Sequence, residues 1–536
     1  MGKYGLSNSN ENLSSIKLEN IKTESSINLT NSNLIYKQNN NLVLNEIALN
    51  QIKSIKENIA VCSIIGSYRS GKSTLLNHLN ELICSHNNIK YDSLKSFQVG
   101  HDENACTKGL NICGSIPKVT NRNGETMSLL FIDTEGLDSD DCQESWDIKI
   151  FMASLLISSI FMFNGQKTLN KQDFNRLSVI TTLSDLVKVQ QNMAQAMNKK
   201  KLKDSCPNFI WLVRDFGLRL TQSKNDYLNK FFEQENPTDC EPKRQKEIDQ
   251  RNEIKENLES SFKSIDCALL KQPIFGEEEL QQLDQMKLSN LRKEYIYDLN
   301  ELYELINTNL TPKQINDRKM NGELFCEYLK LIIDSINSNK TIYLNETINS
   351  AIKKVADHCL EKLICEFNGL CRNLHHLMPL KSSDLEDKLV KRQLNILAKF
   401  KSQFENNSLL LAYNEKLKRN IREIQENLMK KNDEKKIEKD FKKALSDFKQ
   451  KFDFFLKIDT LNQFELELDR FKIDFKLYNS FDNNDEYEKK HLNDQFWNDV
   501  LNHDDANVNT LRRVIIRKEE QKRRDEQLRY SKMKFD

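Results

Sequence analysis

Residues 66–73, with the sequence GSYRSGKS, combine the residue types and the spacing that can bind a phosphate group. Glycines allow successive backbone N–H groups to face the phosphate, a lysine can reach the β- and γ-phosphates, and a serine hydroxyl can ligate Mg²⁺. An apolar run at residues 61–65 predicts a strand before the motif, and residues 74–82 predict a helix after it. We therefore expect a phosphate-binding loop whose nucleotide contacts come from Gly66, Ser67, Tyr68, Arg69, Ser70, Gly71, Lys72, Ser73 and Thr74.

A second motif, Asp133-Thr134-Glu135-Gly136, follows an apolar run at residues 128–132 that predicts a buried strand. A carboxylate at such a strand end can hold a Mg²⁺-bound water, and the N–H of Gly136 can meet a γ-phosphate. Between the two motifs, Thr107 could give a hydroxyl and a carbonyl to the same metal and phosphate. The predicted cofactor is Mg²⁺, bound by Ser73 and Thr107 and, through water, by Asp133.

Two stretches compete for recognition of the base. Residues 170–173, with the sequence NKQD, match a guanine-binding motif, but they lie six residues beyond the predicted strand at residues 158–163 and open a helix, where Asn and Asp are common caps. Residues 208–213 instead predict a buried strand that ends directly in Arg214-Asp215. A carboxylate there can accept from both donors on the guanine edge, and adenine lacks that pair of donors. We favour Arg214 and Asp215 over residues 170–173.

The composition limits the classes of partner and compartment. The 536 residues carry a net charge of +1, so no overall positive charge attracts nucleic acid, and we expect no nucleic-acid partner. Twelve cysteines without a C-x-x-C pair are typical of reduced thiols, so we expect a cytoplasmic protein. The longest apolar run, residues 150–163, is too short to cross a bilayer, and no lipidation motif is visible. Association with a membrane or vesicle is possible, but the sequence shows no anchor for it.

The two halves of the chain differ in character. Twelve of the 14 glycines lie at or before Gly276, and no Gly or Pro follows Pro379, which predicts a loop-rich α/β half followed by long helices. Within the second half, apolar residues recur at helical spacing, which favours packing on a neighbouring helix, with a coiled-coil or partner-binding face as the alternative. The stripe consists of Ile437, Phe441, Ala444, Leu445, Phe448, Phe452 and Phe455.

Together these motifs resemble the guanylate-binding proteins, large GTPases of the dynamin superfamily. The resemblance rests on residues 66–73, Thr107-Lys108-Gly109, residues 133–137, and residues 208–220 with the sequence NFIWLVRDFGLRL, and it continues through residues 320–338. The atlastins share the Arg-Asp pair, but they have paired membrane spans and usually glutamine where Glu135 stands.

The resemblance implies roles that spacing alone does not give. Arg69 occupies the position of an arginine finger that acts in cis when two GTPase domains dimerise head to head, and Glu135 the position that holds the attacking water; with Lys72 they form the expected catalytic set. Leu137 stands where small GTPases keep a glutamine. Val99, Gly100 and His101 match the cap over the triphosphate. Ala105 departs from the family, which commonly has a serine there to relay a proton.

We therefore expect an α/β P-loop GTPase domain, with a mostly parallel sheet flanked by helices, followed by an elongated all-α domain. The expected boundaries are a disordered Ser/Asn-rich segment at 1–30, the GTPase domain at 31–315 and the helical domain at 316–536. The expected function is Mg²⁺-dependent binding and hydrolysis of GTP, with GTP, GDP and a second copy of the chain as partners. The alternatives are a helical scaffold that binds GTP but hydrolyses it poorly, which Ala105 favours, and an atlastin-like membrane GTPase.

Overall fold

The structure, a computed structural model, divides into two compact units, Met1–Val355 and Ala356–Asp536. It describes residues 27–28, 33–92, 96–100, 107–137, 144–178, 186–191, 193, 201–232, 242–403, 410–474, 486–503 and 508–533. The segment expected to be disordered, residues 1–30, lies outside this set apart from strand β1 (Ile27–Asn28).

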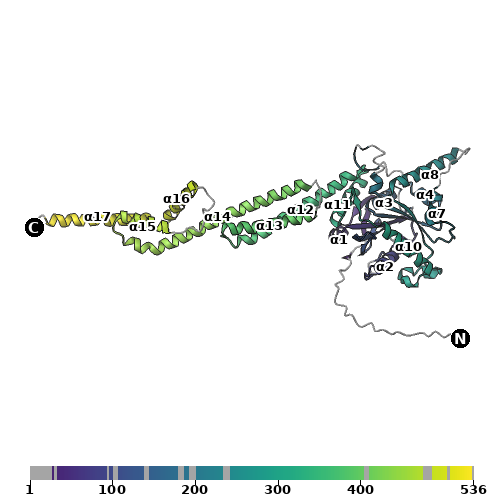
Figure 1. Cartoon of the computed structure of the whole chain (residues 1–536), viewed down its shortest axis with the longest axis horizontal. Coiled ribbons are helices and arrows are strands. Elements are labelled where there is room, and N and C mark those ends of the chain that lie inside the picture. Colours follow the sequence, from purple (N-terminus) through teal and green to yellow (C-terminus); the bar gives the residue numbers. More distant parts are fainter. Residues whose placement is uncertain are drawn as a thin grey trace, which may run out of the picture. The chain divides into compact units, whose positions relative to one another are not determined.

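Within the described part of the first unit, nine strands form one sheet with helices around it (Figure 1). The five strands from β12 to β8 are parallel to one another, and the strands beyond β8 are antiparallel. The predicted α/β fold with a mostly parallel sheet is therefore confirmed. From one edge to the other the strands are β12 (Ile265–Leu269), β11 (Asn208–Arg214), β9 (Ile160–Gln166), β4 (Ile59–Gly66), β8 (Thr126–Thr134), β5 (Leu110–Ile112), β2 (Asn33–Gln38) and β3 (Asn41–Leu44), and β7 (Lys118–Thr120) also pairs with β8.

Burial on both faces explains the apolar sequences of the central strands. All eight residues of β4 are buried, as a strand covered by helices on both sides requires. Ala60, Cys62 and Ile64 point to one face, where they share a core with α2 (Lys72–His86) and α10 (Lys293–Asn309). Because side chains alternate along a strand, Ser63 points to the other face, and it hydrogen bonds to Ser158 at the end of α3 (Glu144–Ile157). The sheet thus carries the phosphate loop on a strand that is fixed from both sides.

The beginning of β4 is held by a hairpin from the end of the first unit, which we call the β4 clasp (residues 313–322). The Ile59 N–H donates to the carbonyl of Met320 at 2.8 Å, and the Lys313 N–H donates to the carbonyl of Ile59 at 2.7 Å. The clasp contains β13 (Gln314–Ile315) and β14 (Arg318–Lys319). It ends at Gly322, where an added Cβ would lie 1.9 Å from the carbonyl oxygen of Ile52.

The hairpin of β2 and β3 is tied to α11 (Gly322–Asn337), which follows the clasp. The Asn337 side chain accepts from the Leu42 N–H at 2.9 Å and donates to the Leu42 carbonyl at 2.8 Å. The same hairpin receives the Lys149 ammonium of α3, which donates to the Asn40 carbonyl at 2.9 Å. The N-terminal hairpin is therefore an integral part of this unit.

The other elements of the first unit surround this framework. The helices are α1 (Glu46–Lys53), α4 (Lys171–Arg176), α7 (Lys224–Phe231), α8 (Pro242–Ser261), α9 (Glu277–Leu280) and the start of α12 (Leu344–His375), with short 3₁₀ turns at Leu283–Gln285 and Leu288–Asn290. Two further strand pairs are β1 with β6 (Ser115–Ile116) and β10 (Val187–Lys188) with β15 (Ile342–Tyr343). Among the described residues, no helix combines the length and apolar character needed to span a membrane.

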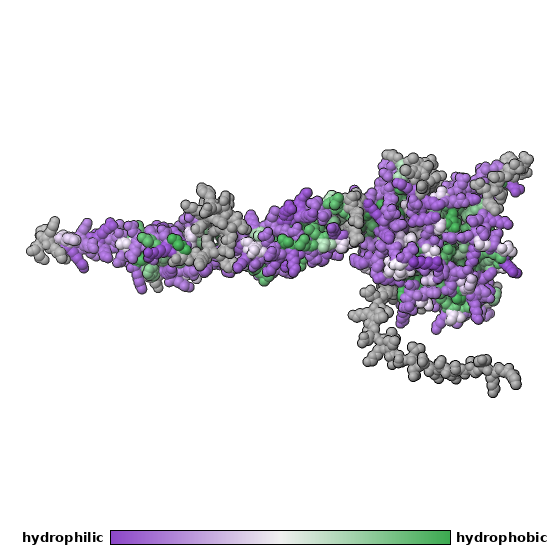
Figure 2. Space-filling view, viewed as in Figure 1, coloured by the Kyte–Doolittle hydropathy of each residue, from purple (hydrophilic) through white to green (hydrophobic). Residues whose placement is uncertain are grey.

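The described part of the second unit consists of helices with a largely hydrophilic visible surface (Figure 2). They are the rest of α12, α13 (Ser382–Gln403), α14 (Leu411–Leu456), α15 (Leu461–Asp474), α16 (Glu486–Asn502) and α17 (Val508–Met533). The apolar stripe of α14 packs against α15, α16 and α17, which confirms the helix-packing interpretation. The helical second part of the predicted fold class is likewise confirmed.

The prediction was wrong at the first residue of that stripe. Ile437 is 37% exposed, and the buried face of α14 continues toward its N-terminus with Asn432, Lys436 and Asp440. The Asn432 side chain bonds to both backbone groups of Leu380, in the turn between α12 and α13. The need to satisfy that turn, which is far away in the sequence, explains why the polar Asn432 occupies a buried position.

Candidate functional site

The phosphate loop joins β4 to α2 through two residues in the left-handed region. Arg69 has φ +58° and Gly71 has φ +72°. Gly71 is also required by space, because an added Cβ would lie 2.1 Å from Nη1 of Arg214. The helix α2 starts at Lys72 and ends at His86, so it is longer at both ends than the predicted residues 74–82. The predicted strand–loop–helix arrangement is confirmed.

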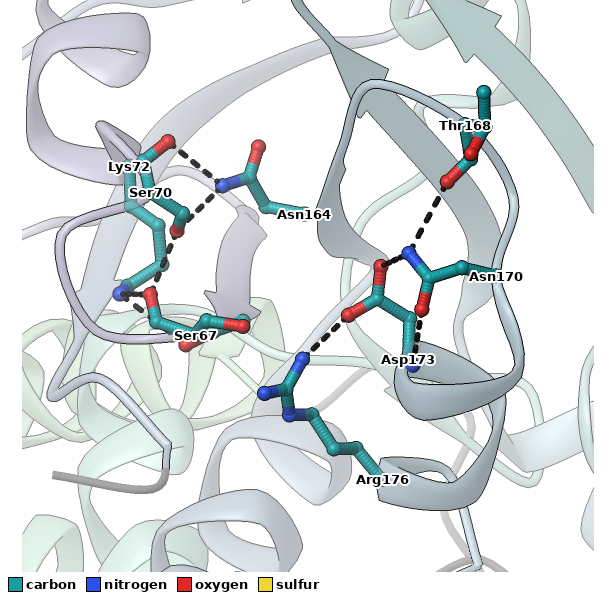
Figure 3. A network of polar contacts seen from close by, with 9 residues as sticks. Ser67, Ser70, Lys72, Asn164, Thr168, Asn170, Asp173 and Arg176 are labelled. Carbon is teal, nitrogen blue, oxygen red and sulfur yellow. Dashed lines mark hydrogen bonds and ion pairs between the residues drawn. The ribbon is translucent and has the colours of Figure 1, made fainter.

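Two side chains from neighbouring strands support this loop from beneath. Arg214, at the end of β11, is only 6% exposed, and its Nη1 donates to the carbonyls of Ser70 at 3.1 Å and Gly71 at 2.5 Å. Asn164 of β9 donates to the carbonyl and the hydroxyl of Ser70 at 3.1 and 2.7 Å (Figure 3). Sequence reasoning gave Arg214 a place at the nucleotide and missed Asn164 altogether. In the structure both side chains bind the loop itself.

The Lys72 ammonium lies inside the curl of the loop. It donates to the carbonyls of Gly66 at 3.3 Å and Ser67 at 3.0 Å (Figure 3). Burial lowers the pKa of Lys72, while the carboxylates of Asp133 and Glu135 oppose that shift. A desolvated cation surrounded by backbone dipoles is a strong partner for an anion that enters the loop.

Three oxygen-bearing side chains from separate segments meet beside Lys72. The Ser73 hydroxyl donates to Asp133 Oδ2 at 2.6 Å, and the Thr107 hydroxyl donates to the same oxygen at 2.9 Å. Burial raises the pKa of Asp133, and Lys72 and the two hydroxyls offset part of this shift. Among the described residues, Asp133 Oδ1 is buried and has no hydrogen-bond partner. Hydroxyl and carboxylate oxygens are the ligands that Mg²⁺ prefers, so this donor set fits the expected ion.

The second motif is joined to the phosphate loop through its backbone. The Leu137 N–H donates to the Gly66 carbonyl at 3.0 Å, and the Tyr68 N–H donates to the Leu137 carbonyl at 3.1 Å. Gly136 packs so closely that an added Cβ would lie 2.4 Å from Tyr68 Cα. Thr134 is fully buried, and its hydroxyl donates to the Ile64 carbonyl at 2.8 Å. The two motifs form one continuous surface.

Glu135 extends from this surface toward the segment that carries Thr107. Its Oε2 accepts from the Gly109 N–H at 2.8 Å and from Trp146 Nε1 at 3.1 Å. Arg69 is exposed, and its guanidinium carbon lies 5.4 Å from the centre of the Tyr68 ring.

A cavity of about 310 Å³ lies over the phosphate loop. Its lining contains most of the predicted nucleotide contacts together with Leu280, the last residue of α9, and Gln281, and no motif could have identified these two residues. The lining residues are Tyr68, Arg69, Ser70, Gly71, Lys72, Ser73, Thr74, Val99, Gly100, Thr107, Thr134, Gly136, Leu280 and Gln281. The predicted contact His101 and the departure at Ala105 lie outside the described residues.

The two candidate base readers have different surroundings. Asp173 is 4% exposed and bonds to the Asn170 amide at 2.7 Å and to Arg176 at 2.6 Å (Figure 3). Asn170 caps α4 by accepting from the Asp173 N–H, which confirms the capping interpretation. The predicted spacing was wrong, because β9 continues to Gln166 through its pairing with β11, which leaves three residues, 167–169, before Asn170.

Asp215 directly follows β11 and has φ +56°, a conformation that aspartate tolerates. Burial raises the pKa of the Tyr295 phenol of α10 to about 12, and the charges of Arg214 and Asp215 shift this pKa in opposite directions. The Tyr295 hydroxyl in turn hydrogen bonds to His78 Nδ1 of α2 at 2.8 Å. The position of Asp215 at a strand end beside the loop matches the expectation for this residue.

The sequence is similar to those of known proteins. The guanylate-binding protein N-terminal domain matches residues 39–314. Guanylate-binding protein 4 of Homo sapiens is 26% identical over 349 residues, which cover 62% of this chain and 51% of that protein. Guanylate-binding protein 6 of Mus musculus is 25% identical over 437 residues, 77% of this chain and 67% of that protein. Guanylate-binding protein 3 of Mus musculus is 26% identical over 357 residues, 62% of this chain and 53% of that protein.

The aligned stretch thus spans about half to two thirds of the length of these relatives. The domain match covers just over half of the chain, from the turn between β2 and β3 to the first residue of β13. It includes the phosphate loop, the Asp133 motif and β11 with Asp215 directly after it. The chain belongs to the guanylate-binding protein family.

Proposed function

We propose that this chain is a large GTPase that binds GTP with Mg²⁺ and hydrolyses it to GDP and phosphate. The observation that carries the proposal is that Lys72, Ser73 and Thr107 line the cavity over the phosphate loop, while the Ser73 and Thr107 hydroxyls both bond to Asp133. A buried ammonium, a helix N-terminus and an oxygen donor set at one point suit a triphosphate with its divalent ion.

Ser73, Thr107 and Asp133 would hold the ion. Bound Mg²⁺ supplies positive charge that stabilises the negative charge of the phosphates. Lys72 would exchange its two carbonyl partners, Gly66 and Ser67, for phosphate oxygens, which offer it full negative charge. Glu135 would orient the attacking water, and the bond between the γ-phosphorus and the bridging oxygen would break as water adds to that phosphorus.

Asp215 is proposed as the guanine reader. The support is twofold: Asp215 stands at a strand end beside the loop, and the carboxylate of Asp173 is already engaged by Asn170 and Arg176. A carboxylate engaged in a buried ion pair would have to give up these bonds in order to bind a base.

Arg69 is proposed as a finger that acts in cis within a head-to-head dimer. Its exposure suits a side chain that is ordered by a second copy. A finger stabilises charge that develops in the transition state, so Arg69→Ala should lower turnover by about 10³-fold or more while GTP affinity changes little. Arg69→Lys should restore little of the lost turnover, because an ammonium cannot contact two phosphate oxygens at once as the planar guanidinium can.

The test measures phosphate release and GTP affinity over a range of protein concentrations. A dimer-activated enzyme shows specific activity that rises with concentration, and Arg69→Ala flattens that dependence. Unchanged turnover in Arg69→Ala would refute the finger. The second candidate function is a nucleotide-gated scaffold, favoured by Ala105, and it requires wild-type protein that binds GTP without measurable turnover at any concentration.

The domain limits are also a proposal, with the GTPase domain at residues 31–315 and the helical region at 316–536. The family match, which ends at residue 314, supports the second limit. Limited proteolysis with mass spectrometry would test both limits.

A further inference from the structure

The Glu135 carboxylate is held by two N–H donors from different parts of the fold. The backbone N–H of Gly109 and the indole N–H of Trp146 both donate to Oε2, at 2.8 and 3.1 Å. The backbone of Glu135 is fixed as well, because its N–H donates to the Gly109 carbonyl at 2.8 Å. A carboxylate with two donors on one oxygen has a defined orientation.

The indole that donates to Glu135 is itself rigidly placed. Trp146 lies in the first turn of α3 and is completely buried. The Lys37 ammonium of β2 stands 4.8 Å from the centre of its ring, within the range of a cation–π interaction. The indole plane is therefore fixed by packing and by a cation on its face.

Strand β2 also supports the other donor. It pairs with β5, which begins at Leu110, and an added Cβ at Gly109 would lie 2.1 Å from the Ile35 carbonyl oxygen of β2. One strand, β2, thus positions both N–H groups that meet on Glu135. A carboxylate can orient a water molecule precisely only if surrounding residues fix its rotamer. Trp146, Gly109 and β2 do this for Glu135.

We propose that Trp146 is a positioning residue for GTP hydrolysis, and that its indole N–H fixes the Glu135 carboxylate in the orientation that directs the attacking water. This inference rests on the proposed function, since it assigns a partner to a residue of that same site. Trp146 contacts Glu135 and acts only through it. The Trp146 ring contributes to core packing, whereas its N–H contributes to turnover through Glu135.

The chain offers a matched control in Trp211 of β11. Trp211 is also completely buried, and among the described residues its Nε1 has no hydrogen-bond partner. Trp146→Phe and Trp211→Phe therefore remove the same atoms from two buried sites, but only the first removes a hydrogen bond to Glu135. The difference between the two variants isolates the bond.

The experiment measures kcat, KM and GTP affinity for the wild type and both variants, with thermal unfolding as the measure of folding. Loss of a hydrogen bond to a charged acceptor should lower kcat by about tenfold to hundredfold in Trp146→Phe, with GTP affinity and KM within about threefold of wild type. Trp211→Phe should keep kcat within about threefold. If Trp146→Phe does not fold, benzothienylalanine at position 146 replaces the N–H by sulfur and keeps the bicyclic ring.

A double-mutant cycle of Trp146→Phe with Glu135→Gln separates an effect through the Glu135 carboxylate from a general loss of active-site structure. Trp146→Phe should lower kcat by less than about threefold in the Glu135→Gln background, because the carboxylate it positions is already gone. Equal loss in both backgrounds, or equal kcat for the two tryptophan variants, would overturn the role of Trp146 and leave the GTPase proposal intact. Wild-type protein without any turnover would instead remove the basis of both. Glu135→Gln with wild-type turnover would overturn the role of Glu135, and with it that of Trp146, and would leave the GTPase proposal intact.

Discussion

Replacement of Arg214 by methionine should weaken GTP binding even though the arginine is buried beneath the phosphate loop. Its Nη1 donates to the carbonyls of Ser70 and Gly71, and the loop lies directly on the guanidinium. Methionine keeps much of the volume of the side chain and removes both hydrogen bonds. The loop would then lose the contact that keeps its N–H groups pointed at the phosphates.

The size of the effect follows from these two bonds. A hydrogen bond that involves a charged group contributes about 1.5–3 kcal/mol. The two bonds share one nitrogen and are not independent, so we take a combined loss of about 3 kcal/mol, which corresponds to roughly a 100-fold rise in the Kd for GTP. Arg214→Lys should recover less than about tenfold of this loss, because an ammonium cannot reproduce the planar geometry.

The assay is titration of a fluorescent GTP analogue in the presence of Mg²⁺, with circular dichroism to verify folding. Arg176→Met is the matched control, since Arg176 is a partly buried arginine that pairs with Asp173 on α4 at 2.6 Å. Its Kd should stay within about threefold of wild type. A folded Arg214→Met protein with wild-type affinity would refute the reasoning, and full recovery by Arg214→Lys would show that charge alone is needed.

Three further predictions concern the same unit. Lys72→Ala should abolish detectable triphosphate binding by calorimetry, because the phosphates lose their desolvated charge partner, and retained affinity would contradict the phosphate-loop assignment. Asp215→Asn should weaken GTP binding strongly while Asp173→Asn changes it little, and the reverse order in a nucleotide titration would transfer the role to residues 170–173. Burial, with a smaller contribution from Arg214, lowers the pKa of His78 from its ordinary value near 6.5 to about 4. The unfolded chain therefore binds the proton first as the pH falls, and wild type should lose about 2–3 kcal/mol more unfolding free energy than His78→Gln between pH 7 and 4.5 in urea denaturation; parallel losses would show that His78 does not titrate in this way.

The fold and the core of the site could be predicted from local sequence. The strand β4, the phosphate loop and the Asp133 motif are contiguous stretches, and the residue types within each stretch determine its backbone structure. Thr107 could be placed near Ser73 only by its position between two motifs, and the structure brings both hydroxyls to Asp133. The local residue sequence is sufficient to predict a site when residues that are neighbours in the sequence form its contacts.

The supports of the site could not be predicted, because they are contacts between distant segments. Nothing near Trp146 in the sequence points to Glu135, and an asparagine within an apolar strand gives no sign that Asn164 holds the phosphate loop. The end of β9 was misplaced for a related reason, since pairing with β11 extends the strand beyond its apolar run. Likewise, the buried Asn432 of α14 bonds to the backbone of a turn more than fifty residues away in the sequence.

The β4 clasp has a consequence for how the first unit can be shortened. Strand β4 carries the phosphate loop at one end, and at the other end its first residue, Ile59, is hydrogen bonded to Lys313 and Met320. At about 3.3 Å per residue, eight residues make a rigid strut of roughly 26 Å with no flexible joint between clasp and loop. A fragment that ends at residue 315 would leave the Ile59 N–H without its Met320 acceptor and would remove Gly322 from its seat against Ile52. A fragment that continues through Asn337 would keep the strut anchored and would also retain the pair of bonds to Leu42.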